Sequence, residues 1–275
     1  MKYFYLTSSE IAKLTGHNQY EPLDKVIRSL LKKFGIKDVY VPKSNIEEGL
    51  RNLTPVEFSK LSEELDKLNG TWTSENIYKV KPSITSNDIF HCESRIKKLI
   101  LNPSQSIGLT EEQSKQVLQS KTNNTAVLEQ LNNYITKDLR MRRGNVKENK
   151  NLNTLQTKKE IKVDQRNSRM YTKELVRTDD YCIILRGKVD GVSGDTVVEA
   201  KNRCNRLFKE LRDYERVQLE AYMFLTGYNK SILTEHYNDT SFQIDYTHDE
   251  QFWKECVSAI ETFIDTHIVP HIPQE

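Results

Sequence analysis

The stretch that decides the fold runs from residue 181 to residue 201 and reads YCIILRGKVDGVSGDTVVEAK. It holds two apolar runs typical of strands, Tyr181–Gly187 and Asp195–Val198, and a turn-rich sequence between them, Gly191–Asp195. The pattern predicts a β-hairpin that is closed by this turn.

Three polar side chains in this hairpin have the spacing of a metal-dependent hydrolytic site. The hairpin brings Asp190 beside Glu199, and Lys201 shares a face with Glu199 because side chains two apart in a strand point the same way. Two carboxylates and the Ala200 carbonyl can hold a hard divalent cation, while the lysine steers or activates a water near a phosphate. Solvated charges on a hairpin are the alternative, since 29% of the residues are charged. Against it, carboxylates on apolar strands are costly to bury without a cation.

A predicted amphipathic helix over 214–225 and an N-terminal helix start add to this pattern. Gln218 and Tyr222 stand at i and i+4, so they share a helix face that suits hydrogen bonding to a lysine, a water or a phosphate. Thr7-Ser8-Ser9-Glu10 before an apolar periodic run is typical of a helix N-terminus, where amides and hydroxyls can bind phosphate. A solvated helix face and a simple helix cap are the respective alternatives.

In this order, the motifs resemble those of the lambda exonuclease and YqaJ viral-recombinase group, within the PD-(D/E)xK nuclease superfamily. The resemblance covers roughly residues 3 to 268 and ends in an amphipathic helix from Asp249 to His267. The Gln-x-x-x-Tyr helix is shared with RecB-like nucleases. No single motif is specific, and their order and spacing carry the resemblance.

The resemblance implies a role for each matching residue. Asp190 and Glu199, with the Ala200 carbonyl, would ligate Mg²⁺ or Mn²⁺, with two ions expected. Lys201 would orient or deprotonate the attacking water, and Gln218 would support the lysine or the water.

Further residues would serve the DNA. Tyr222 would pack or bond near Gln218 at the phosphate-binding side, and Ser9 of the Thr-x-Ser-Glu signature would lie near a DNA phosphate. Lys188 stands where lambda exonuclease has a serine that helps hold the 5′-phosphate, and a lysine binds phosphate only as a point charge. Lys188 thus departs from the family's pattern for recognition of a 5′-phosphate.

The family's upstream glutamate is assigned to Glu129, at the start of a predicted helix that runs to about Leu139. The glycine that usually precedes this acid is missing, so Glu93 is a rival. A basic segment follows: residues 137–177 hold thirteen Lys and Arg against five Asp and Glu, whereas the whole chain has a net charge of +2. We expect its first arginines to contact DNA phosphates, with a merely solvated loop as the alternative; these are Arg140, Arg142 and Arg143.

The expected fold is mixed α/β (α+β), a PD-(D/E)xK restriction-endonuclease-like core with a central mixed β-sheet flanked by helices. We expect a helical N-terminal region at 1–120, the nuclease core at 121–268 and a tail at 269–275. Within the first region, helices are predicted near Ser9–Leu14, Leu23–Phe34, Thr54–Leu68 and Glu111–Gln119. Strands at Ser231–Tyr237 and Phe242–Tyr246 precede the last helix.

The four cysteines form no CxxC pair, which disfavours a zinc ribbon. No signal peptide or apolar span of transmembrane length is evident, so we expect a soluble intracellular protein with reduced thiols.

The sequence thus predicts a Mg²⁺-dependent DNA nuclease. The resemblance favours a 5′–3′ exonuclease acting on double-stranded ends in recombination, repair or replication, of viral or phage origin. It also implies a homo-oligomer, a trimer in lambda exonuclease, and a single-strand annealing protein as partner. A structure-specific endonuclease and a DNA-binding or assembly protein with a decayed site are the alternatives.

Overall fold

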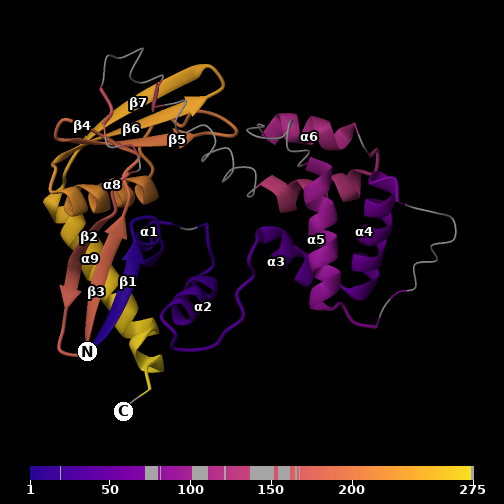
Figure 1. Cartoon of the computed structure of the whole chain (residues 1–275), viewed down its shortest axis with the longest axis horizontal. Helices are drawn as coiled ribbons and strands as arrows, with labels where there is room; N and C mark the ends of the chain where they lie inside the picture. The colour runs from indigo at the N-terminus through magenta and orange to yellow at the C-terminus, as the bar shows by residue number, and fades with distance from the viewer. Residues whose placement is uncertain are drawn as a thin grey trace. The chain divides into compact units, whose positions relative to one another are not determined.

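The computed structural model describes residues 1–18, 20–71, 80, 82–100, 111–120, 122–136, 152–153, 162–164, 166 and 168–273. The chain forms two compact units. The first comprises Met1–Val41, Glu148–Lys201 and Leu207–Glu275, and the second comprises Pro42–Lys147 with Asn202–Arg206. The structure is a mixture of helices and β-sheets, as predicted (Figure 1).

The first sheet of the first unit has three strands in the order β1-β3-β2. Strand β1 (Lys2–Thr7) pairs in parallel with β3 (Tyr181–Gly187), and β2 (Tyr171–Arg177) pairs with β3 in antiparallel fashion. The sequence had not predicted β1 or β2. Because β1 is a strand of this sheet, residues 1–41 group with the sheet, which differs from the expected division at residue 120.

The second sheet has four strands in the order β4-β5-β6-β7. It contains β4 (Gly191–Ser193), β5 (Thr196–Asn202), β6 (Lys230–Tyr237) and β7 (Thr240–Thr247). The predicted hairpin needs correction: β5 pairs with β4, not with β3. Ser193 faces Thr196 across a two-residue turn at which Gly194 has φ 61°, so residues 191–193 form a strand where the sequence had predicted only a turn.

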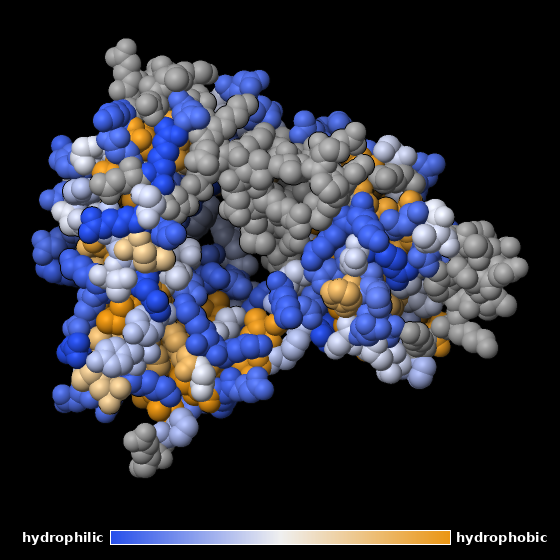
Figure 2. Space-filling view, viewed as in Figure 1, coloured by the Kyte–Doolittle hydropathy of each residue, from blue (hydrophilic) through white to orange (hydrophobic). Residues whose placement is uncertain are grey.

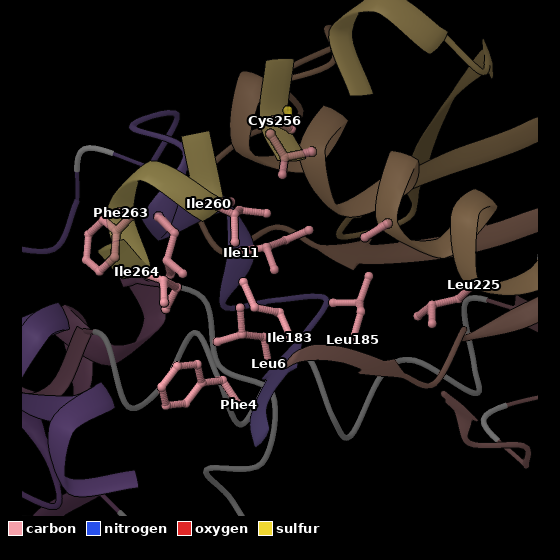
Figure 3. Close-up of a cluster of buried hydrophobic side chains, with 14 of the residues drawn as sticks. Phe4, Leu6, Ile11, Ile183, Leu185, Leu225, Cys256, Ile260, Phe263 and Ile264 are labelled. Atoms are coloured by element: carbon pink, nitrogen blue, oxygen red, sulfur yellow. The ribbon is translucent and has the colours of Figure 1, made fainter. Parts of the chain in front are cut away.

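A buried apolar cluster joins the first sheet to its helices α1 (Ile11–Leu14), α2 (Leu23–Lys33), α8 (Asp213–Thr226) and α9 (Glu250–His267). The inward side chains of the strands meet those of α9 (Figure 3); they include Phe4, Leu6, Ile183, Leu185, Ile260, Phe263 and Ile264. After α9, a 3₁₀ turn, η1 (Val269–His271), follows.

The ends of α8 and α9 follow from local sequence. Gly227 ends α8 in the left-handed conformation, φ 78°, which glycine adopts without steric cost. Asp249 caps α9 by accepting a hydrogen bond from the Phe252 amide. Helix α8 contacts β2, β3 and β6, and therefore touches both sheets (Figure 1).

The described residues of the second unit are mostly helical. The unit contains α3 (Asn45–Arg51), α4 (Pro55–Leu68), α5 (Ser86–Ile100), α6 (Glu111–Gln119) and a helix at 125–136. The predicted start of α4 is confirmed, because Thr54 and Glu57 form a reciprocal capping box. The predicted α6 is also confirmed, whereas α3 and α5 had not been predicted individually.

Hydrophilic side chains predominate on the face shown in Figure 2, with hydrophobic ones scattered between them. Within the described ranges, no helix combines the length and the apolar character needed to cross a membrane.

Candidate active site

Lys201 is the centre of the candidate site. Its Nζ donates hydrogen bonds to Oε1 of Glu199 at 2.6 Å and to Oε1 of Gln218 at 2.9 Å. Glu199 and Lys201 lie two residues apart on β5, and Gln218 comes from α8. The structure thus brings these three predicted residues together.

Glu199 is engaged through only one of its carboxylate oxygens. Its side chain is 4% exposed, and Oε1 accepts from Lys201, whereas Oε2 is buried without a hydrogen-bond partner. A buried carboxylate oxygen that lacks a donor is costly, because burial removes its water and nothing replaces it. This open oxygen fits a hard divalent cation, which takes carboxylate oxygens as ligands.

Asp190 lies against the backbone of β5. Its Oδ2 accepts a hydrogen bond from the amide of Ala200 at 2.8 Å, so its carboxylate is next to the residue that follows Glu199. Across the described part of the chain, no group of three or more His, Cys, Asp and Glu side chains is arranged to hold a metal ion. Metal ligation by Asp190, Glu199 and the Ala200 carbonyl stays a prediction.

Three carboxylates act on the charge of Lys201. Burial opposes its ammonium form, but Glu199, Glu215 and Asp190 outweigh burial and raise the pKa of Lys201 above its ordinary value. Lys201 is therefore a cation at neutral pH in the metal-free protein.

Tyr222 supports Gln218 from one helical turn away. The Gln218 Nε2 donates to the Tyr222 hydroxyl at 2.9 Å, and Tyr222 is only 6% exposed. A Cβ built on Gly187 would lie 3.2 Å from the Tyr222 ring and 2.1 Å from the Ser8 hydroxyl, so both side chains pack against this glycine. Tyr222 therefore packs and hydrogen-bonds beside Gln218, and a contact of Tyr222 with DNA stays a prediction.

The predicted phosphate-binding residues Ser9 and Lys188 are both exposed. The Ser9 hydroxyl lies 3.2 Å from the Thr7 hydroxyl. Glu10 accepts hydrogen bonds from the Thr7 amide and hydroxyl, both at 2.8 Å, so it fixes the turn on which Ser9 sits. Contact of either residue with DNA stays a prediction.

The two candidates for the upstream acid belong to the second unit. Glu129 is exposed and lines a groove of about 600 Å³ together with residues of α4. Oε1 of Glu93 accepts hydrogen bonds from the Ser44 hydroxyl at 2.6 Å and from the Lys97 ammonium at 2.5 Å. The choice between them stays a prediction. Three predicted DNA contacts, Arg140, Arg142 and Arg143, lie outside the described residues.

The sequence interpretation missed Glu215. This acid is only 1% exposed in the first turn of α8, three residues before Gln218, and it acts electrostatically on Lys201. Its i, i+3 spacing from Gln218 was the available signal.

No family model and no curated protein matches the chain. Similar solved structures include the protein SSO0001, with 16% identity over 78% of this chain and 86% of that chain and a TM-score of 0.36. An alkaline exonuclease, LHK-Exo from Laribacter hongkongensis, has 13% identity over 65% and 87%, with a TM-score of 0.38. A phage-related exonuclease from Haemophilus somnus 129PT has 12% identity over 48% and 73%, with a TM-score of 0.35. These similarities are too distant to assign a family or a function.

Proposed function

We propose that this chain is a metal-dependent deoxyribonuclease of the PD-(D/E)xK type that hydrolyses phosphodiester bonds at the ends of duplex DNA. The observation that carries the proposal is the position of Lys201, whose ammonium is held between Glu199 and Gln218 while the second Glu199 oxygen stays open. A surface ion pair would not require a strand and a helix to bury these groups together.

Asp190 and Glu199 would hold Mg²⁺ or Mn²⁺. When bound, such a cation lowers the pKa of a water and stabilises negative charge on the phosphodiester. The chain's own residues position the reactants: Gln218 holds the ammonium of Lys201 in place, and that ammonium stabilises charge at the phosphate and orients the water. Because its pKa is raised, Lys201 acts as a positive charge and a hydrogen-bond donor, not as a base, before the cation binds.

The proposal is tested by comparing the wild type with Lys201→Ala on linear and closed-circular duplex DNA, in Mg²⁺, in Mn²⁺ and in EDTA. We expect the wild type to degrade linear DNA only with metal, to leave the circle intact, and to lose this activity in Lys201→Ala. Lys254→Ala is the matched control, because it removes an exposed lysine whose partner, Glu250, lies on the same helix.

The other outcomes identify the alternatives. Cleavage of the closed circle would replace the exonuclease with an endonuclease of the same chemistry. DNA binding without metal-dependent loss of any substrate would indicate a binding or assembly protein. Linear duplexes labelled at either the 5′ or the 3′ end report polarity, and we expect release from the 5′ end.

A further inference from the structure

The first sheet has an outer face, on the side away from the apolar cluster, and β1 contributes two tyrosines to it. Phe4 and Leu6 of β1 are fully buried in the cluster. Because side chains alternate between the two faces of a strand, Tyr3 and Tyr5 lie on the outer face. Tyr3 is 50% exposed and Tyr5 is 40% exposed. Two aromatic rings of this edge strand are therefore in contact with solvent on the same face.

A guanidinium group lies over one of these rings. The Cζ of Arg186, on β3, is 3.9 Å from the centroid of the Tyr5 ring, which is a cation–π contact. The strands β1, β2 and β3 contain a single acid, Glu174, and the Nε of Arg177 donates a hydrogen bond to its Oε1 at 2.9 Å. The outer face thus combines aromatic rings with a stacked cation, while the acid of these strands is neutralised by an ion pair.

Charge along the sheet becomes more positive toward the candidate site. Strands β1 and β3 are parallel, so their carboxyl ends lie at the same end of the sheet. Beyond that end, the chain continues from β3 through the exposed Lys188 to Asp190 of the candidate site. The opposite end carries the turn between β2 and β3, in which Asp179 and Asp180 are exposed. A polyanion is therefore attracted to the half of the sheet that leads to the site.

We propose that this outer face binds single-stranded DNA, with bases stacked on Tyr3, Tyr5 and the Arg186 guanidinium. Unpaired bases stack on aromatic rings and on guanidinium planes, whereas the bases of a duplex are already stacked on one another. The direction of the charge favours a polyanion over a protein partner. The inference rests on the proposed function for the origin of its ligand, because removal of one strand from a duplex end leaves the other strand single.

The test is binding of a fluorescently labelled oligothymidylate, measured by anisotropy in EDTA for Tyr3→Thr, Tyr5→Thr and the matching Phe variants. Threonine removes the ring and keeps a high strand propensity, whereas phenylalanine keeps the ring and removes only the hydroxyl. We expect each Thr variant to weaken binding about 5- to 100-fold, and each Phe variant to bind within about twofold of wild type. Tyr20→Thr is the matched control: Tyr20 is 74% exposed outside this sheet, and its loss should change binding by less than about twofold.

Arg186 gives a second readout. Arg186→Gln should weaken binding and reduce the slope of log affinity against log salt by about 0.7, the value for one phosphate contact on a single strand. Three results would overturn the inference: unchanged affinity in the Thr variants, an equal loss in Tyr20→Thr, or a wild type that self-associates through this face and binds no oligonucleotide.

The binding assay is independent of the nuclease, because EDTA prevents metal-dependent cleavage. A wild type that binds the oligonucleotide through Tyr3 and Tyr5 but degrades no DNA in Mg²⁺ would refute the proposed function alone. A wild type that degrades linear duplex in Mg²⁺ but does not bind the oligonucleotide would refute the single-strand site alone.

Discussion

Gly187 is the position where the N-terminal segment meets the helix that carries Gln218, and replacing it with alanine should couple strongly to Ser8. A Cβ at residue 187 would lie 2.1 Å from the Ser8 Oγ, 3.0 Å from a Leu225 methyl carbon and 3.2 Å from the Tyr222 ring. Ser8 is 2% exposed, and its hydroxyl donates to the Arg186 carbonyl at 3.3 Å. The hydroxyl therefore has to move, and this hydrogen bond is lost.

The expected cost follows from these contacts. Loss of one buried hydrogen bond costs about 1 kcal/mol, and overpacking costs roughly 1–3 kcal/mol, so Gly187→Ala should reduce the free energy of unfolding by about 2–4 kcal/mol. Ser8→Ala alone should cost about 1 kcal/mol. Because Ser8→Ala removes the clashing oxygen, the double variant should lose about 1–2 kcal/mol less than the sum of the single losses.

The assay is equilibrium unfolding in urea, followed by the fluorescence of Trp253. This residue is 7% exposed within the same apolar cluster, and a Trp72→Phe background makes it the only tryptophan, since the chain has two. Gly194→Ala is the control: Gly194 has φ +61° and open space around it, so alanine there should cost about 1–2 kcal/mol through the backbone alone. Strict additivity of Gly187→Ala with Ser8→Ala would refute the reasoning.

Three further predictions concern ionisable groups. Burial raises the pKa of the Cys92 and Cys256 thiols to about 11 and about 12; the reactive thiolate is thus disfavoured in the folded protein. The free energy of unfolding should fall as the pH rises above the thiol pKa of the unfolded state, about 8.5. Alkylation of these thiols at pH about 8 should proceed only when the protein unfolds, and fast labelling of the native protein would contradict this. Burial acts to raise the pKa of Glu10, but the hydrogen bonds of Glu10 to Lys33 and Thr7 outweigh burial and lower this pKa. The stabilisation by ionised Glu10 is therefore fully present above the pKa of the unfolded state, and it is lost as the pH falls through the pKa of the folded state. Urea unfolding should therefore separate wild type from Glu10→Gln by about 1 kcal/mol at pH about 6, and by less at pH about 3; a constant gap would count against the ion pair. Glu235 is fully buried and accepts hydrogen bonds from the backbone amides of Phe208 and Lys209, at 3.0 and 2.8 Å. Thermal unfolding should therefore show that Glu235→Ala reduces the free energy of unfolding by about 2–4 kcal/mol and Glu235→Gln by clearly less. Equal losses in the two variants would contradict the argument.

Elements with local signals could be predicted from the sequence. Three helix ends have such signals: the Thr54 capping box, the glycine after α8 and the aspartate before α9. All three ends lie within a residue or two of their predicted positions. Strand β1 lacks such a signal. Its partner, β3, is more than a hundred residues away in the chain, and a pairing of that separation leaves no periodic trace in either segment.

The hairpin error has a related cause. Two apolar runs near each other in sequence favour each other as partners, but three residues, Gly191–Ser193, suffice to pair with β5. Gly191 has no side chain where Val163 packs, and a Cβ there would lie 2.3 Å from a Val163 methyl carbon. That contact comes from a distant segment, so the short strand β4 could not be inferred locally.

In the candidate site, too, the residues with a local sequence signal were predicted and a residue without a clear one was missed. The Glu199–Lys201 contact follows from strand periodicity, and the Gln218 contact follows from one amphipathic helix, so both were predictable. Glu215 was missed despite its spacing from Gln218, because an acid in the first turn of a helix normally faces water and strengthens the helix N-terminus. Only its 1% exposure distinguishes it from Asp213 in the same turn.

Charge balance connects these residues to a divalent cation. Asp190, Glu199 and Glu215 all act electrostatically on Lys201, and these four side chains sum to a formal charge of −2 when all are ionised. A buried carboxylate oxygen without a hydrogen-bond donor is unfavourable, and an uncharged side chain at residue 199 would avoid that cost. The chain instead has Glu199, the single acid of β5, with its Oε2 buried and without a hydrogen-bond partner. A divalent cation at that oxygen would supply the missing partner, so we expect Mg²⁺ to raise the unfolding temperature above its value in EDTA, and no difference between the two would count against the proposed metal site.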